Sequence, residues 1–475
     1  MDVKKGIRII AFLMIFVMLF SAYSYVMMDK TENAYSATLK DEEDNSIDVI
    51  FLGSSQMIYG VQPMQLWNDY GIVSYNLATS ATTIPMSYWA AKIALEKQNP
   101  KYIVLDVAFI TTNDKILNYE LPRLHALLDN FTFSRNKYLA VKDLVNEEDR
   151  LQFYLPVYLY HTRWKGLSQK DFTKLSDNNT KGAHLHDGVV DFENYFQRVD
   201  SEVKDDFNPI AKEYILKLND LCKENGIQLI LTAIPTLHSS GAQGMFHTVA
   251  DVASANQIEF INGYEDSNYW GLDYATDFFD GAHVNLRGSE KITKYIGEYL
   301  KENCSILDHR NEDKYRSWDE AYEDYLKFKN SIHVYPEYSF GENISFGTTG
   351  NAGQYFVSGL KESQHSDFTW SNGKRSDAFF YLNEKIDLEL KCQIAYVKPL
   401  RMSKERVIEI YFNNQYIDSV KLDSSQESIV ISTNISKEYI NYNGFQQLTL
   451  KYIDIDQDVM EEQTIALKNI ILQKR

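Results

Sequence analysis

Short apolar runs alternate with amphipathic stretches over residues 46–303. The apolar runs fall at residues 46–53, 72–78, 101–109, 227–235 and 258–262. Stretches with the period of a helix lie at residues 83–98, 209–226, 242–255 and 286–302. Strands that are apolar on both faces and separated by helices are typical of a parallel sheet with helices on both sides. We therefore predict an α/β domain at residues 46–303.

A long insert interrupts this alternation. Residues 114–206 mix aromatic and charged side chains, as in "LPVYLYHTRWKGL". We expect the insert to be helical and to lie over the carboxyl edge of the sheet, where such folds place their sites. His161, Arg163 and Trp164, in "YHTRW", are candidates for holding an acceptor molecule. Packing within the insert is the alternative explanation for the same residues.

The pattern changes beyond residue 335. "RVIEIYF", "YIDSVKL", "ESIVIST", "QLTLKYI" and "ALKNIIL" are short, rich in β-formers and partly alternating, and turn signals such as Asn413-Asn414 separate them. This predicts an antiparallel β-sandwich or jelly roll at residues 335–475, joined by a charged helical connector at residues 304–334. Trp370 in this domain is a candidate for stacking on a sugar ring, with a core or rim tryptophan as the alternative.

An uncharged apolar stretch occupies residues 9–28. As a helix, its 20 residues span about 30 Å, the thickness of the hydrocarbon core of a bilayer. Lys4, Lys5 and Arg8 precede it and acidic residues follow, which predicts a single-pass anchor with a cytoplasmic N-terminus and an extracellular bulk. Residues 29–45 are then a polar linker. A cleaved signal peptide is the alternative.

Composition narrows the possible functions. The net charge of -18 argues against a nucleic-acid partner, because neutralising phosphates needs clustered Lys and Arg. Cys222, Cys304 and Cys392 are too few and too scattered for a disulfide framework or a zinc site. The chain also contains no Gly-x-Ser-x-Gly elbow, no His-Glu-x-x-His and no P-loop. We accordingly predict neither a metal nor a cofactor.

Two short motifs carry candidate chemistry. Gly53-Ser54-Ser55 ends the first predicted strand, and Asp280-Gly281-Ala282-His283, in "FFDGAHVNLRG", precedes the last predicted helix of the domain. A carboxylate can fix the tautomer of an imidazole, which can then remove the proton of a serine hydroxyl. A parallel sheet would bring both motifs to its carboxyl edge, so Ser55, His283 and Asp280 form a candidate catalytic triad. The alternatives are a helix-capping serine and a surface histidine.

With these motifs the sequence resembles the SGNH/GDSL hydrolase superfamily over about residues 46–303. "VIFLGSSQ" is similar to its first block, with Ser55 at the nucleophile position, and "DGAHVNLRG" is similar to its last block. The resemblance implies that the backbone amides of Ser55 and Ala81 hold the oxyanion; Ala81, in "NLATSATT", stands where the family often has glycine. Asn113, in "LDVAFITTND", is a further candidate donor that comes about three residues later than in the family, and Asp106 is the other polar residue there.

Gly-Ser-Ser with divergent middle blocks resembles the membrane-anchored SGNH proteins of bacterial envelope acylation, such as those of alginate O-acetylation and teichoic-acid D-alanylation. That resemblance implies transfer of an acyl group through Ser55 to a polysaccharide or teichoic acid, with a polytopic membrane-bound O-acyltransferase as partner. An esterase acting on glycan or lipid and a non-catalytic polysaccharide-binding assembly protein are the alternatives. The C-terminal segment, with "YFVSGLKE" and "FTWSNGKRSDAFFYL", resembles a galactose-binding-like jelly roll, which implies carbohydrate binding.

Overall fold

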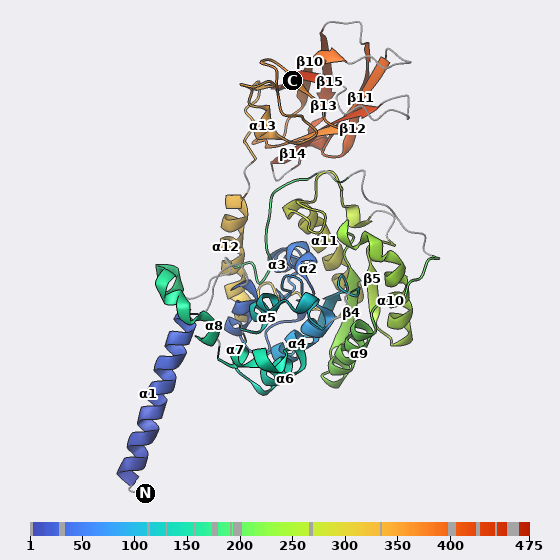
Figure 1. Cartoon of the computed structure of the whole chain (residues 1–475). Coiled ribbons are helices and arrows are strands. Elements are labelled where there is room, and N and C mark those ends of the chain that lie inside the picture. The colour runs from blue at the N-terminus through green and yellow to red at the C-terminus, as the bar shows by residue number, and fades with distance from the viewer. Residues whose placement is uncertain are drawn as a thin grey trace. The chain divides into compact units, whose positions relative to one another are not determined.

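The chain divides into two compact units (Figure 1). The first unit holds most of residues 1–332, and the second holds residues 333–475 together with the short segments 189–193 and 274–276. The structure, a computed structural model, describes residues 3–27, 34–111, 115–129, 131–155, 157–172, 179–190, 192, 202–265, 269–332, 335–397, 405–423, 428–441, 444–453 and 465–475.

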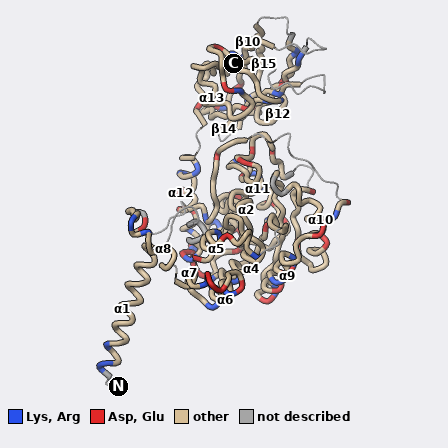
Figure 2. Tube along the Cα trace, in the orientation of Figure 1, with Lys and Arg blue, Asp and Glu red and all other residues tan. Residues whose placement is uncertain are grey.

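The first described helix is long and apolar. α1 (Val3–Met27) has 25 residues, which corresponds to about 37 Å, and it is long and apolar enough to cross a membrane. Figure 2 shows Lys and Arg near its N-terminal end and uncharged residues along the rest of the helix. The predicted N-terminal apolar helix is therefore confirmed. A signal sequence has the same properties, and the orientation of α1 stays a prediction.

A five-stranded parallel sheet forms the centre of the first unit. The strand order is β2-β1-β3-β4-β5, and every neighbouring pair is parallel. Parallel neighbours need crossover connections, and helices supply them here. The predicted α/β class of this part of the chain is thus confirmed. The strands are β1 (Val49–Leu52), β2 (Ser74–Asn76), β3 (Tyr102–Asp106), β4 (Gln228–Ala233) and β5 (Glu259–Asn262).

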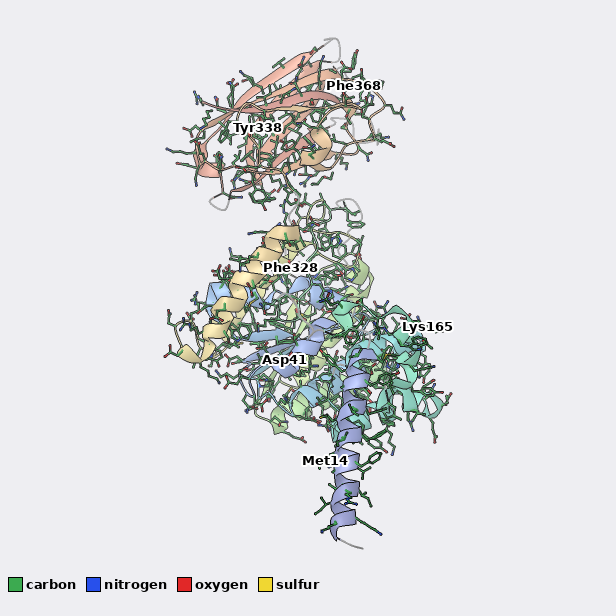
Figure 3. All side chains as sticks on the ribbon, turned by 90° about the vertical axis from the view of Figure 1, so that its left-hand side faces the viewer. Met14, Asp41, Lys165, Phe328, Tyr338 and Phe368 are labelled. Carbon is green, nitrogen blue, oxygen red and sulfur yellow. The ribbon has the colours of Figure 1, made fainter. Side chains whose placement is uncertain are left out.

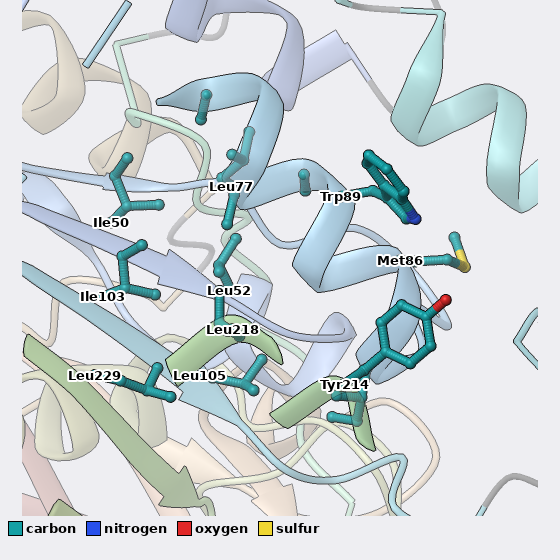
Figure 4. Packing of buried hydrophobic residues seen from close by; sticks show 14 of the residues in the cluster. Ile50, Leu52, Leu77, Met86, Trp89, Ile103, Leu105, Tyr214, Leu218 and Leu229 are labelled. Carbon is teal, nitrogen blue, oxygen red and sulfur yellow. The ribbon is translucent and has the colours of Figure 1, made fainter. Parts of the chain in front are cut away.

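Helices pack on this sheet or on the helices that cover it, and they complete the core. They are α2 (Ser55–Gly60), α3 (Pro63–Tyr70), α4 (Ile84–Ala94), α9 (Pro209–Glu224), α10 (Gln243–Ala255), α11 (Leu286–Asn303) and α12 (Arg316–Ile332). On one face, Ile50 and Leu229 of the strands lie in one cluster with Trp89 of α4 and Tyr214 of α9 (Figure 4). Alternate strand residues such as Val104 are buried as well. Because both faces of the sheet are buried, the strand sequences are unbroken apolar runs.

The helical part of the insert lies beside the sheet. It comprises α5 (Leu121–Leu128), α6 (Arg135–Leu144), α7 (Arg150–Tyr154) and α8 (Val157–Tyr160). Asp143 of α6 accepts hydrogen bonds from Trp89 (2.8 Å) and from the hydroxyl of Tyr214, which ties α6 to α4 and α9. This differs from the expected position over the carboxyl edge, because the polar partners of α6 are on these flanking helices. Residues 183–188 do reach that edge, where the N–H of His184 donates to the carbonyl of Ile58 (3.0 Å).

Two segments expected to link domains contribute to the first unit. In the expected linker, the hydroxyls of Thr38 and Tyr75 share a buried hydrogen bond of 2.6 Å. In the expected connector, α12 buries Trp318 and Tyr325 in the core of the first unit. These two aromatic residues are seven positions apart and therefore share one face of the helix. We predicted a linker and a connector because both segments are rich in charged residues. Their few apolar residues nevertheless pack into the core of the first unit.

The second unit is an antiparallel β-sandwich, as predicted. One sheet has the order β13-β10-β15-β6 with β8 also on β15, and the other has the order β12-β11-β14-β9-β7. Leu390 and Leu472 from the first sheet share a core with Ile410 and Leu450 from the second. The elements are β6 (Asn343–Ser345), α13 (Ala352–Tyr355), β7 (Phe356–Ser358), β8 (Thr369–Trp370), β9 (Arg375–Tyr381), β10 (Leu388–Val397), β11 (Glu405–Phe412), β12 (Gln415–Asp423), β13 (Ile429–Ile435), β14 (Phe445–Ile453) and β15 (Ile465–Lys474).

Asn76, at the end of β2, holds α2 in place. Its buried side-chain amide donates to the carbonyls of Met57 (2.8 Å) and Val61 (3.0 Å). We expect Asn76→Ala to lower the free energy of unfolding of the first unit by about 2–3 kcal/mol, because buried carbonyls lose a donor. Denaturant unfolding measures this. Asn68→Ala is the control, since within the described residues the side-chain amide of Asn68 bonds only the exposed carboxylate of Asp69. Equal effects of the two substitutions would contradict the prediction.

Candidate active site

Ser55 is the first residue of α2, directly after the turn that follows β1. The preceding residue, Ser54, caps the helix, since its Oγ accepts from the N–H of Gln56 (3.4 Å). The capping role that was the alternative for these serines therefore belongs to Ser54. At the start of a helix, the backbone N–H of Ser55 has no intrahelical acceptor. Ser55 thus offers both a hydroxyl and an amide to a ligand at the carboxyl edge.

Gly53 makes the turn between β1 and α2 possible. Its φ is 142°, in a region that residues with a side chain rarely adopt. A Cβ at this position would also lie 2.9 Å from the Cβ of Asp106, at the end of β3. Glycine is needed here for its backbone conformation and for the close approach of β3.

His283 reaches Ser55 from the loop before α11. Its Nε2 lies 2.6 Å from the Oγ of Ser55, and its Nδ1 lies 2.9 Å from each carboxylate oxygen of Asp280. Asp280 Oδ1 also accepts from the N–H groups of Ala282 (2.8 Å) and His283 (2.9 Å), so that one carboxylate holds both the loop and the ring. The carboxylate favours the proton on Nδ1 and leaves Nε2 free to accept from serine.

A buried carboxylate fixes this loop to α11. Asp277 pairs with Lys291 (2.5 Å) and Arg287 (3.6 Å) of the helix. Its backbone carbonyl accepts from the N–H of Asn285 (2.8 Å), and the side chain of Asn285 caps the same helix. The position of His283 therefore follows from the way α11 begins.

Aromatic rings that the sequence analysis did not single out surround His283. Phe279 stacks on it with ring centroids 5.4 Å apart, and Tyr59 lies 5.2 Å away. His186 stacks on Phe279 at 4.0 Å, and His184 meets the edge of Tyr59 at 5.5 Å. Burial lowers the pKa of His184 to about 4, so this ring is neutral at pH 7. Two features of the sequence could have indicated that these rings belong to the site: the His-x-His pattern in the insert, and the position of Phe279 directly before Asp280.

Ala81, one of the candidate oxyanion donors, lies in the turn that follows Thr79. The N–H of Thr79 donates to the carbonyl of Gly53 (3.4 Å), which links the start of the following turn to the residue two positions before Ser55. Within that turn, Ala81 has a φ of 54°. Glycine adopts this left-handed region most readily, so that Ala81 holds a backbone conformation that few residues with a side chain adopt. Asn113 lies outside the described residues.

Of His161, Arg163 and Trp164, only Arg163 bonds to the end of α1 within the described residues. They belong to the short helix η4 (His161–Gly166), which packs against α1. Arg163 donates to the carbonyl of Met27 (2.9 Å) and pairs with Asp171 (2.8 Å). The Nδ1 of His161 lies 2.7 Å from the carbonyl of Tyr158, and Trp164 is exposed. The contacts of Arg163 fit the alternative of packing within the insert, and a role of the three residues in holding an acceptor stays a prediction.

Trp370 belongs to the second unit. It lines a cavity of about 580 Å³, and its ring meets the edge of Phe368 with centroids 5.8 Å apart. The other walls of the cavity are largely polar and include Glu362, Gln364 and Asn372. The rings of Trp370 and His365 among several polar groups, in a cavity of this size, suit a small ligand.

The three cysteines are free thiols. Burial raises the pKa values of Cys222 and Cys392 to about 12, so both thiols are protonated at pH 7 and pack as small apolar side chains. In the part of the chain that the structure describes, no three His, Cys, Asp or Glu side chains are grouped so that they could hold a metal ion.

Asp106, behind Gly53, is a buried carboxyl group. It is 2% exposed, its Oδ1 accepts a long hydrogen bond from the N–H of Ile234 (3.5 Å), and burial raises its pKa to about 7. The folded state therefore binds this proton more tightly than the unfolded state. The resulting stability is complete below the ordinary pKa of 3.8 and is lost as the pH rises to about 7.

We expect Asp106→Asn to weaken this pH dependence, because asparagine cannot ionise. The free energy of unfolding of the variant, relative to wild type, should increase between pH 4 and pH 8 by on the order of 3–4 kcal/mol. Urea unfolding at several pH values measures the difference. A constant difference across this range would contradict the prediction.

No protein-family model matches the chain, and no curated protein matches it. Among solved structures, the chain is similar to a GDSL-like lipase from Bacteroides thetaiotaomicron (12% identity over 57% of this chain and 96% of the lipase, TM-score 0.27). It is also similar to a two-domain esterase active on acetylated mannans (10% identity over 92% of this chain and 93% of the esterase, TM-score 0.27). A third is a family 35 carbohydrate binding module from Clostridium thermocellum (10% identity over 28% of this chain and 99% of the module, TM-score 0.19). The assignment of the site rests on its own geometry.

Proposed function

We propose that the first unit is an SGNH-type serine acyltransferase of the membrane-anchored branch, with Ser55 as its nucleophile. The observation that carries this proposal is the 2.6 Å contact of Ser55 Oγ with His283 Nε2, with Asp280 on the opposite nitrogen of the ring. A serine hydroxyl becomes an effective nucleophile when a base is positioned in this way.

The reaction would proceed through an acyl-serine. His283 accepts the proton of Ser55 as Oγ attacks the carbonyl carbon of the acyl donor, and Asp280 stabilises the imidazolium. The backbone N–H of Ser55 stabilises the oxyanion, with an N–H at Ala81 as the second donor. The leaving group departs with the proton from His283. An acceptor hydroxyl then loses its proton to His283 and attacks the acyl carbon. As the bond from this carbon to Ser55 Oγ breaks, His283 returns the proton to Oγ, which restores the free serine.

We propose acetyl transfer to a cell-surface or secreted polysaccharide, or to a teichoic acid, as the reaction. In this proposal α1 is an uncleaved anchor with a cytoplasmic N-terminus, and a polytopic membrane-bound O-acyltransferase supplies the acyl group from the membrane. The length and apolar character of α1 support the anchor. The cavity at Trp370 supports a glycan ligand, because it combines an aromatic ring with polar side chains.

Hydrolysis is the second candidate, and the exposure of the site favours it. The side chain of Asp280 is 47% exposed and that of His283 is 20% exposed, which gives water access to an acyl-serine. Water in place of the sugar hydroxyl would make the protein an esterase acting on glycan or lipid. A rate of acetate release that is unchanged by a glycan acceptor, without acetylation of that glycan, would identify the esterase.

A serine-directed fluorophosphonate tests for catalysis. We expect the probe to label the full-length protein, and Ser55→Ala to abolish both labelling and the hydrolysis of p-nitrophenyl acetate. Ser54→Ala is the matched control: it removes a helix cap, at a cost of about 1 kcal/mol, and should still be labelled. An unlabelled wild-type protein, or equal labelling of Ser55→Ala, would refute the proposal and leave a non-catalytic polysaccharide-binding protein.

Asp280→Asn tests the role of the carboxylate. It should reduce kcat on p-nitrophenyl acetate by roughly 10²- to 10⁴-fold, because it weakens the hold on the Nδ1 proton and on the imidazolium. KM should change far less, since Asp280 contacts the histidine and the loop in the structure. Circular dichroism would verify that the variant is folded. An unchanged kcat in a folded variant is the contrary result.

A further inference from the structure

A group of exposed apolar side chains lies on the insert. It consists of Leu155, Tyr158, Leu159, Trp164 and Phe172, which we call the insert surface. Trp164 is 63% exposed and Phe172 is 64% exposed, although both are large and apolar. These side chains lie on consecutive short elements that contact one another or α1, and exposed apolar side chains on neighbouring elements indicate an interaction surface.

The insert surface is attached to the C-terminal end of α1. The helices α8, η4 and η5 (Gln169–Phe172) all pack against α1. Arg163 donates to the carbonyl of Met27 (2.9 Å) and pairs with Asp171 (2.8 Å), which in turn accepts from the N–H of Ser168 (2.7 Å). Figure 3 shows Lys165 near the end of α1 that joins the rest of the unit, with Met14 farther along the helix. Residues 157–172 are therefore held beside Met27.

The length of α1 determines where residues 157–172 would lie relative to a membrane that contains the helix. A hydrocarbon core of about 30 Å needs about 20 helical residues. Counted from Arg8, the last charged residue before the apolar stretch, this span ends at residue 28. A membrane that contains α1 thus has one headgroup layer beside residues 157–172. Tryptophan and tyrosine are enriched at this depth, because their rings combine an apolar body with a polar group.

The charge of this part of the insert also fits a membrane surface. Residues 155–172, which include the whole insert surface, contain the basic residues Arg163, Lys165 and Lys170 but the single acidic residue Asp171, which gives a net charge of +2. The whole chain carries -18. Basic residues next to exposed apolar side chains favour binding to anionic lipid headgroups.

We propose that the insert surface is a second membrane contact, which lies in the headgroup layer of the leaflet at the C-terminal end of α1. The rings of Tyr158, Trp164 and Phe172 enter the boundary between headgroups and acyl chains, and nearby basic side chains meet lipid phosphates. This contact restricts the rotation of the first unit about its anchor. It depends on α1 being a retained membrane span, as in the proposed function, and is independent of the chemistry at Ser55.

Quenching of tryptophan fluorescence by brominated lipids tests this contact in the full-length protein. The protein is placed in nanodiscs of mixed zwitterionic and anionic lipids, with and without bromine on the upper part of the acyl chains. Of the other tryptophans, Trp67, Trp89, Trp270 and Trp318 are buried, and Trp370 belongs to the second unit. We expect bromine to quench a part of the wild-type emission and this part to disappear in Trp164→Phe.

Two added substitutions in the Trp164→Phe background control the measurement. Tyr158→Trp restores a tryptophan on the insert surface and should restore quenching. Phe328→Trp places one on α12, away from α1 in Figure 3, and should not be quenched. Equal quenching of wild type and Trp164→Phe, or equal quenching from positions 158 and 328, would overturn the proposal.

A photo-crosslinking residue at position 158 in cells identifies the occupant of the surface. Crosslinks to lipid support the proposal, whereas crosslinks to a polytopic membrane protein in place of lipid would overturn it in favour of a protein partner. Ser55→Ala should be quenched like the wild-type protein. Failure of the membrane contact and failure of the serine chemistry therefore appear in different measurements.

Discussion

The contact between Ser55 Oγ and His283 Nε2 joins two segments that are 228 residues apart in the sequence. It depends on the parallel sheet, because parallel strands deliver successive loops to one carboxyl edge. Ser55 is positioned by the start of α2 and His283 by the start of α11. Gly53 and Asp277 keep these two helix starts in place, the first by its backbone conformation and the second by its ion pairs with α11. The proposed chemistry therefore depends on the backbone conformation of Gly53 and on the ion pairs of Asp277.

The insert contacts two parts of the first unit to which we assign a function, the proposed membrane anchor and the candidate active site. Near its middle, Arg163 bonds the carbonyl of Met27 at the end of α1. Farther along, His184 and His186 join the aromatic rings around His283 through Tyr59 and Phe279. One insert thus contacts both the proposed membrane anchor and the candidate active site. The proposed acyltransferase would receive its acyl group at a membrane and would need its nucleophile at a defined place relative to that membrane. An insert with both contacts would meet this need.

Patterns within short stretches of sequence predicted the strands, the helices and the turn that carries Asp280 and His283. Strands buried on both faces give unbroken apolar runs, and Asp280 with His283 three residues later fits within one turn. The meeting of Ser55 and His283 followed from the expected topology of a parallel sheet, but most other contacts between distant segments had no such signal. The bond from Arg163 to Met27 joins residues 136 positions apart, and the rings around His283 come from three separate segments. The packing of Trp318 was missed because the surrounding charge dominated the prediction of a connector.

The site of acylation tests the central claim most directly. The protein is mixed with an activated acetyl ester, quenched in acid, digested and analysed by mass spectrometry. We predict acetyl groups on the peptide that contains Ser55, at the serine itself, and their loss in His283→Ala. Consumption of the ester with acetyl on a different residue, or with none on this peptide under conditions that trap acyl-enzymes, would contradict the proposed role of Ser55.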